Sequence, residues 1–122
     1  MIRSALLLLA GVLWASSAFA DGDAARGELI YQRCQLCHSI RTDDVGPHHA
    51  GLFGRHAGSV PDFPYSDAMR NSGIVWSETT LDQFLTNPQA YVPGTRMTFA
   101  GLPDTQERAD VIAYLKEAAK LP

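Results

Sequence analysis

Cys34-Gln35-Leu36-Cys37-His38 is the stretch of sequence that decides the fold, because C-x-x-C-H is the attachment pattern of a c-type haem. Two thiols at this spacing can each form a thioether bond with a vinyl group of the porphyrin. The histidine that follows can place an imidazole nitrogen on the iron as an axial ligand. The motif therefore predicts one haem, held covalently by Cys34 and Cys37 and coordinated by His38.

A C-x-x-C pair also occurs in thioredoxin-like redox sites and as one half of a zinc site. The sequence contains only these two cysteines, without a second pair of Cys or His at similar spacing. It also shows no βαβ pattern around the motif. Haem attachment is therefore favoured, and a disulfide or a metal site is the remaining alternative.

The first 20 residues are typical of a secretory signal. Residues 1–3 carry one positive charge, residues 5–15 form an almost unbroken apolar run, and Ala18-Phe19-Ala20 has the small residues that signal peptidase accepts. We expect residues 1–20 to be removed after export to a periplasm, which leaves residues 21–122 as one domain. The alternative is an uncleaved anchor, although the run is shorter than the roughly 20 apolar residues that span a bilayer.

Removing 20 of the 122 residues leaves a mature chain of 102, enough for one small domain. Without Arg3, nine Lys and Arg stand against 13 Asp and Glu, a formal charge of −4. This balance argues against nucleic acid and against an anionic membrane surface as partners. We expect a monomer without stable membrane association after the signal is removed.

Hydrophobic spacing predicts an all-α domain with long loops. Apolar and small residues recur every three or four positions in Asp23–Cys34, which predicts a helix that delivers Cys34 to the haem. Gly27 weakens this helix by about 1 kcal/mol relative to Ala, so we expect another backbone to pass close by. Near the C-terminus, Asp104–Glu107 resembles a capping box, and the helix after it carries one apolar side. We expect the two terminal helices to cross at Gly27.

Further helices are predicted between these two. Ser77 can cap a helix that carries Leu81, Phe84 and Leu85 and stops at Asn87-Pro88. Ser66–Gly73 is typical of one or two turns closed by a glycine. The loop Val45–Tyr65 is rich in Gly and Pro, and a loop of this length in a small domain is expected to wrap around a ligand.

Met97 is the predicted sixth ligand of the iron. It lies in a turn-rich segment, and its soft thioether favours ferrous over ferric iron. Met69 is the alternative thioether, but its helical setting favours a packing role. Three loop histidines could instead provide bis-histidine ligation, although exposure is their commoner role: His48, His49 and His56.

The sequence resembles the class I cytochromes c, the family of mitochondrial cytochrome c and its bacterial periplasmic relatives. The resemblance extends over Gly22–Leu121. Besides the C-x-x-C-H motif, it rests on segments that occur in the family's order: Gly46-Pro47, Gly51-Leu52-Phe53-Gly54-Arg55, Gly73-Ile74, Trp76, Asn87-Pro88 and Tyr91–Gly101.

The resemblance implies an all-α fold in which the terminal helices cross and loops wrap around one covalent haem. It implies that His38 and Met97 are the axial ligands and that the carbonyl of Pro47 accepts the other imidazole N–H. The resemblance also implies three side chains near the inner haem propionate: Arg55, Tyr65 and Trp76. In addition, Thr95 would be the main polar residue left in the haem crevice, because Phe84 and Met69 stand where the mitochondrial protein has polar residues.

The surface departs from the mitochondrial pattern. The mature chain has only Lys116 and Lys120 as lysines, while Arg33 and Arg96 keep two positive positions by resemblance. The resemblance implies a soluble periplasmic carrier that moves one electron at a time between redox-partner proteins, and no enzyme. The alternatives are a haem subunit or module of a larger oxidoreductase, and a peroxidase-like haem protein.

Overall fold

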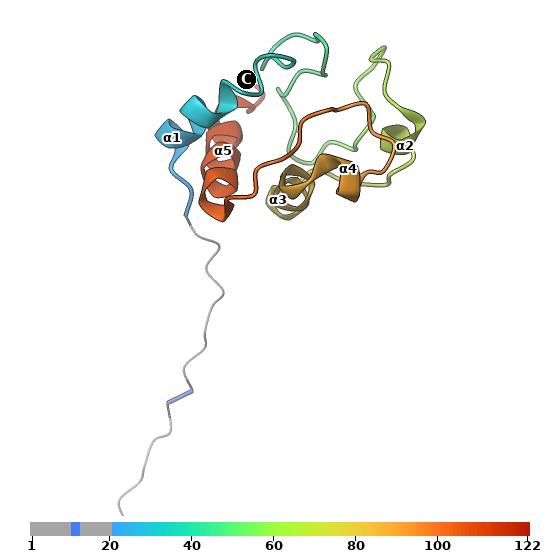
Figure 1. Ribbon diagram of the computed structural model, residues 1–122. Coiled ribbons are helices and arrows are strands. Elements are labelled where there is room, and N and C mark those ends of the chain that lie inside the picture. Colours follow the sequence, from blue (N-terminus) through green and yellow to red (C-terminus); the bar gives the residue numbers. More distant parts are fainter. Residues whose placement is uncertain (1–10, 13–20) are drawn as a thin grey trace, which may run out of the picture.

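The computed structural model describes residues 11–12 and 21–122, so the predicted signal peptide lies almost entirely outside the described residues. The described part of the chain is helical and contains no strand, which confirms the predicted all-α class. A single antiparallel bridge joins His56 and Val75. The described residues form five helices: α1 (Ala24–Tyr31), α2 (Asp67–Arg70), α3 (Glu78–Thr86), α4 (Pro88–Tyr91) and α5 (Thr105–Ala118). Figure 1 shows that α3 and α4 adjoin, while loops separate the other helices.

The first and last helices pack against each other, as the blue and red helices of Figure 1 show. A Cβ atom on Gly27 would lie 1.9 Å from the carbonyl oxygen of Asp110, so only glycine permits this approach. Gly22 is equally close to α5, because its Cβ would lie 2.0 Å from the carbonyl oxygen of Ala109. The predicted crossing at Gly27 is therefore present, and the chain before α1 also lies against α5.

The helix α1 ends at Tyr31, three residues earlier than predicted. Turns continue from there through the C-x-x-C-H motif: the amide of Cys34 donates to the Tyr31 carbonyl (2.8 Å), and that of His38 donates to the Cys34 carbonyl (2.8 Å). The motif is therefore presented on turns that follow α1 and not on the helix itself.

Only one residue, Asn87, separates the end of α3 from the start of α4. The predicted cap of α3 is present, since Ser77 and Thr80 each accept a hydrogen bond from the other's backbone amide. Asn87 ends α3 as predicted, but its side chain also accepts from the amide of Ala90 (3.2 Å) and caps α4. Pro88 is the first residue of α4, a position that tolerates proline because the missing N–H has no helical partner there. The sequence analysis did not predict α4.

Two other helix ends differ in detail from expectation. Asp104 caps α5 by accepting from the amide of Glu107 (2.9 Å), but the Glu107 carboxylate faces Arg33 instead of completing a capping box. The predicted turns after Ser66 form a single helical turn, α2, which Gly73 follows with φ +70°. None of the helices in residues 21–122 is long and apolar enough to cross a membrane.

Candidate haem site

A cavity of about 550 Å³ opens between the helices and the long loops, within the range of about 300–1,000 Å³ usual for cofactor sites. Its walls are mainly apolar and come from α1, α2, α3, α5 and the loops. Every candidate site residue from the sequence lines this one cavity: Cys34, Cys37, His38, Pro47, Arg55, Tyr65, Trp76, Thr95 and Met97. An apolar cavity with two thiols and an imidazole on its wall fits a haem.

The two cysteines are half-buried, and no disulfide joins them. Burial raises the pKa of Cys34 to about 11, so this thiol stays protonated at neutral pH. Redox-active C-x-x-C pairs instead rely on a lowered cysteine pKa. The described residues also contain no cluster of three or more His, Cys, Asp or Glu side chains placed to hold a metal ion.

His38 is oriented by its backbone surroundings. Its Nδ1 lies 2.8 Å from the carbonyl oxygen of Pro47, so the N–H at this position donates and Nε2 keeps its lone pair. A Cβ atom on Gly46 would lie 2.3 Å from Cε1 of the ring, so this glycine leaves room for the imidazole. Burial lowers the pKa of His38, which favours the neutral form that coordinates a metal.

Arg55, Tyr65 and Trp76 form a more polar part of the wall. The guanidinium group of Arg55 donates to the carbonyl oxygens of His48 (2.9 Å) and Ala50 (3.3 Å). The hydroxyl oxygen of Tyr65 accepts from the amide of Val60 (3.2 Å). A fixed cation beside a phenol and an indole suits a carboxylate at this wall.

The two candidate thioether ligands, Met97 and Met69, both line the cavity, but they are held by different backbone structures. Met97 lies in a loop, where its amide donates to the hydroxyl of Thr95 (3.3 Å) and its carbonyl accepts from Gln89. Met69 is buried within α2, and its amide is capped by Ser66 (3.1 Å). The Met97 side chain is attached to an irregular loop and the Met69 side chain to a helical turn in the core.

The three loop histidines differ in their surroundings. His48 does not line the cavity, and its Nδ1 is paired with Asp43 at 2.7 Å. His56 is exposed and is also absent from the lining. His49 does line the cavity, but its ring stacks on His38 with the centroids 4.3 Å apart. A ring stacked on His38 would lie on the same side of a haem as His38, so His49 would not supply a second histidine ligand.

Comparison with known proteins decides the family. The cytochrome c family model matches residues 24–119, almost all of the predicted domain. The chain belongs to the cytochrome c family. Cytochrome c2 of Rhodomicrobium vannielii is 50% identical over 109 residues, which cover 87% of each chain. Cytochrome c2 of Blastochloris viridis is 48% identical over 110 residues, again 87% of each chain.

A solved structure gives the same result for the fold. The chain is similar to cytochrome cH from Methylobacterium extorquens, with a TM-score of 0.76 and 42% sequence identity over 78% of this chain and 98% of that one. The resemblance to class I cytochromes c is therefore confirmed. As a cytochrome c the chain is an electron-transfer protein and not an enzyme, and its family carries covalently bound haem.

Proposed function

We propose that residues 21–122 form a periplasmic electron carrier with one haem, attached through Cys34 and Cys37 and coordinated by His38 and Met97. The supporting observation is that all four side chains line one apolar cavity in a cytochrome c fold. Bound haem supplies a one-electron ferric/ferrous couple. The chain supplies the ligands, the cavity and the surface that meets other proteins.

The individual side chains have separate tasks. Pro47 holds the Nδ1 proton of His38 and thereby makes Nε2 a better donor. Met97 would provide a soft sulfur ligand, which favours reduced iron and so would raise the reduction potential. Three residues of the wall would receive a propionate carboxylate, with Thr95 as a further polar contact: Arg55, Tyr65 and Trp76. Buried apolar residues such as Leu52 exclude water, which favours the less charged reduced state.

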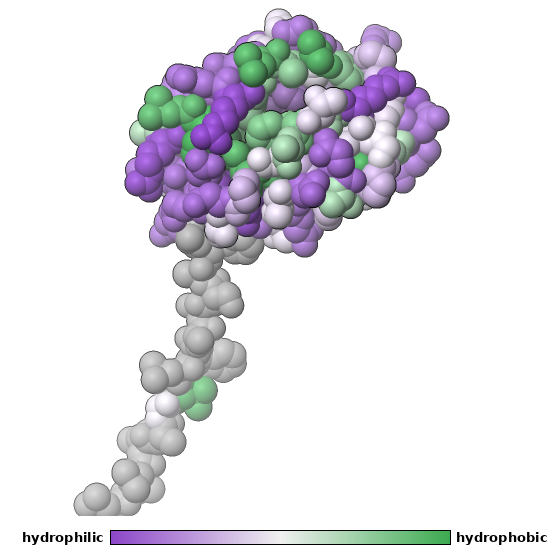
Figure 2. Space-filling model, in the orientation of Figure 1, coloured by the Kyte–Doolittle hydropathy of each residue, from purple (hydrophilic) through white to green (hydrophobic). Residues whose placement is uncertain are grey.

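The redox partner docks on an apolar rim of the cavity. Leu36 and Val45 line the cavity while remaining 81% and 73% exposed. Arg33 is paired with Glu107 across 3.4 Å, so its charge is largely neutralised. Arg96 donates to the carbonyl oxygen of Pro64 (2.6 Å) and remains exposed. Figure 2 shows hydrophobic side chains at the upper edge of the molecule with hydrophilic ones around them.

An intact-mass measurement tests attachment and processing together. We expect the purified periplasmic protein, after acid and organic extraction, to have the mass of residues 21–122 plus one haem. Anaerobic titration of the same sample should show a single reversible one-electron transition. The variant Cys34→Ser is the control, because it removes one thioether and should weaken haem retention. Haem-free protein from properly matured cells contradicts the attachment, and a mass that begins at Met1 contradicts the cleavage.

A further inference from the structure

Tyr31 brings a hydroxyl group into the junction between α1 and α5. The side chain is completely buried (0% exposed), and its ring centroid lies 5.2 Å from that of Tyr114 on α5. Its hydroxyl oxygen is 2.8 Å from Nδ1 of His49, its only hydrogen-bond partner among the described residues. A buried polar group without a partner is costly, so these two side chains satisfy each other.

His49 in turn lies face to face with His38. The two ring centroids are 4.3 Å apart and the planes differ by 22°. Tyr31 meets His49 at a steeper angle, with the centroids 5.7 Å apart and the planes at 61°. A helix-anchored phenol therefore fixes His49, and His49 lies flat against the proposed axial ligand.

The contact between Tyr31 and His49 links the two side chains in either tautomer of the imidazole. The Tyr31 hydroxyl can donate to Nδ1 of His49 or accept from it, so the 2.8 Å hydrogen bond holds the His49 ring in both cases.

The His38 ring needs a second support besides Pro47. A hydrogen bond at Nδ1 fixes one edge of the imidazole but lets the ring rock about the line from Cβ to that atom. A flat neighbour in contact with its face removes this freedom. We infer that Tyr31 and His49 form a positioning pair that sets the plane of the His38 imidazole, a role that rests on the proposed ligation by His38.

Proton NMR of the ferric holoprotein tests the inference. In low-spin ferric haem, the plane of the axial imidazole contributes, together with the orientation of the thioether, to how the unpaired electron is shared among the haem methyl groups. Tyr31→Phe keeps the ring but removes the hydrogen bond, and His49→Leu removes the stacked ring. We expect both variants to change the spread of the methyl shifts and to shift the reduction potential, with covalent haem and thioether ligation retained.

Two further variants separate positioning from simple packing. His49→Gln keeps an acceptor for Tyr31 without a flat aromatic ring, so it should recover thermal stability relative to His49→Leu and still alter the methyl shifts. His56→Gln is the matched control, because His56 is an exposed histidine outside the cavity, and it should leave the shifts unchanged.

Two outcomes would overturn the inference, and they are distinguishable. If Tyr31→Phe and His49→Leu lower the thermal midpoint but keep the parent's methyl pattern, the pair is structural only. If the unaltered protein lacks covalent haem or shows no axial histidine, the proposed ligation fails, and the positioning role fails with it.

Discussion

Met97 and Met69 are two thioethers on the wall of one cavity, and only their surroundings tell them apart. Met69 packs in the core through a capped helical turn, whereas Met97 lies in a loop whose backbone is held by Thr95 and Gln89. A ligand must reach the iron without distorting the core around it. The loop residue meets this requirement more readily, which is why Met97 is the proposed ligand.

Replacing Met97 by alanine should remove the soft donor and leave the thioether attachment intact. We expect loss of the weak near-infrared band of ferric thioether ligation and a lower reduction potential, because the ferrous state loses its preferred ligand. Absorption spectroscopy and redox titration measure both effects. Met69→Leu is the control, since it preserves packing while removing the sulfur. A band that survives in Met97→Ala and disappears in Met69→Leu would transfer the ligand role to Met69.

Some residue-level features follow from sequence patterns and others do not. The C-x-x-C-H spacing is a local chemical requirement, so a cavity with Cys34 and Cys37 on its wall is predictable. His49 is different, because loop composition favours exposure and only the fold brings it against His38. Tyr31 gives a sequence signal for a buried polar partner such as His49. It is an aromatic residue on an apolar helix face, and its hydroxyl, once buried, requires a hydrogen-bond partner.

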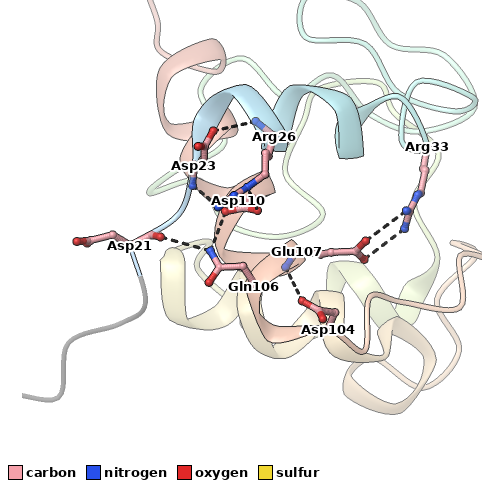
Figure 3. A network of polar contacts seen from close by, with 8 residues as sticks. All are labelled: Asp21, Asp23, Arg26, Arg33, Asp104, Gln106, Glu107 and Asp110. Atoms are coloured by element: carbon pink, nitrogen blue, oxygen red, sulfur yellow. Dashed lines mark hydrogen bonds and ion pairs between the residues drawn. The ribbon is translucent and has the colours of Figure 1, made fainter.

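At the level of elements, one buried carboxylate joins α5 to α1 and to the residue that caps it. Asp110 is 3% exposed and accepts from the amide of Asp23 (2.7 Å), Nε of Arg26 (3.2 Å) and Nε2 of Gln106 (2.9 Å). Figure 3 shows these groups converging on it from both sides of the junction. Although burial opposes ionisation, these donors keep the pKa of Asp110 below its ordinary value.

The lowered pKa gives stability a defined pH dependence. A carboxyl whose pKa is lower in the folded state stabilises the protein above its unfolded pKa of about 3.9, and this contribution is lost as pH falls through the folded value. We expect Asp110→Asn to lower the unfolding free energy at pH 7 by about 1–3 kcal/mol, because a charged acceptor is lost. Denaturant titrations at pH 7 and below pH 4 measure this.

The unfolding free energy of Asp110→Asn should also fall less steeply than that of the parent as pH is lowered, since the titrating carboxyl is gone. Glu117→Gln is the matched control, an exposed carboxylate of the same helix, and it should change neither quantity appreciably. Equal acid sensitivity in Asp110→Asn and the parent would show that other carboxyls control acid unfolding.

Sequence patterns predict the existence of these elements better than their ends. Gly27 marks the crossing because a helix tolerates a central glycine chiefly where another backbone needs the space. The end of α1 at Tyr31 and the short helix α4 are not predictable from periodicity. Asn87-Pro88 stops one helix and starts the next, and a stop signal alone does not reveal the second function.

At the level of the whole molecule, the net charge and the exposed apolar residues beside the cavity both favour a partner surface that is apolar and not strongly acidic. The predicted mature chain has a formal charge of −4, and the two exposed residues Leu36 and Val45 flank the cavity. Arg33 is neutralised by Glu107, which the sequence alone does not show. Steering by an extended positive face is therefore weak.

Electron transfer to an acidic mitochondrial-type oxidase should be slow and only weakly dependent on salt. Attraction between exposed opposite charges is screened over roughly 8 Å at physiological ionic strength, and this protein has little such attraction to lose. Stopped-flow rates across a salt series measure the dependence. Glu107→Gln releases Arg33 and should increase both the rate and its salt sensitivity. A fast reaction of the parent that collapses as salt rises would show that a local positive face dominates.

The junction at Gly27 also has a consequence for cooperativity. Asp23 and Asp110 are 87 positions apart, so bringing them together costs about 4 kcal/mol of loop-closure entropy. With eight residues, α1 is too short to remain helical by itself in water. The first contact carries almost the whole entropic cost, and each further contact forms at little additional cost. Breaking one contact between α1 and α5 recovers almost no chain entropy as long as the other contacts remain. We therefore expect α1 to separate from α5 in a single step.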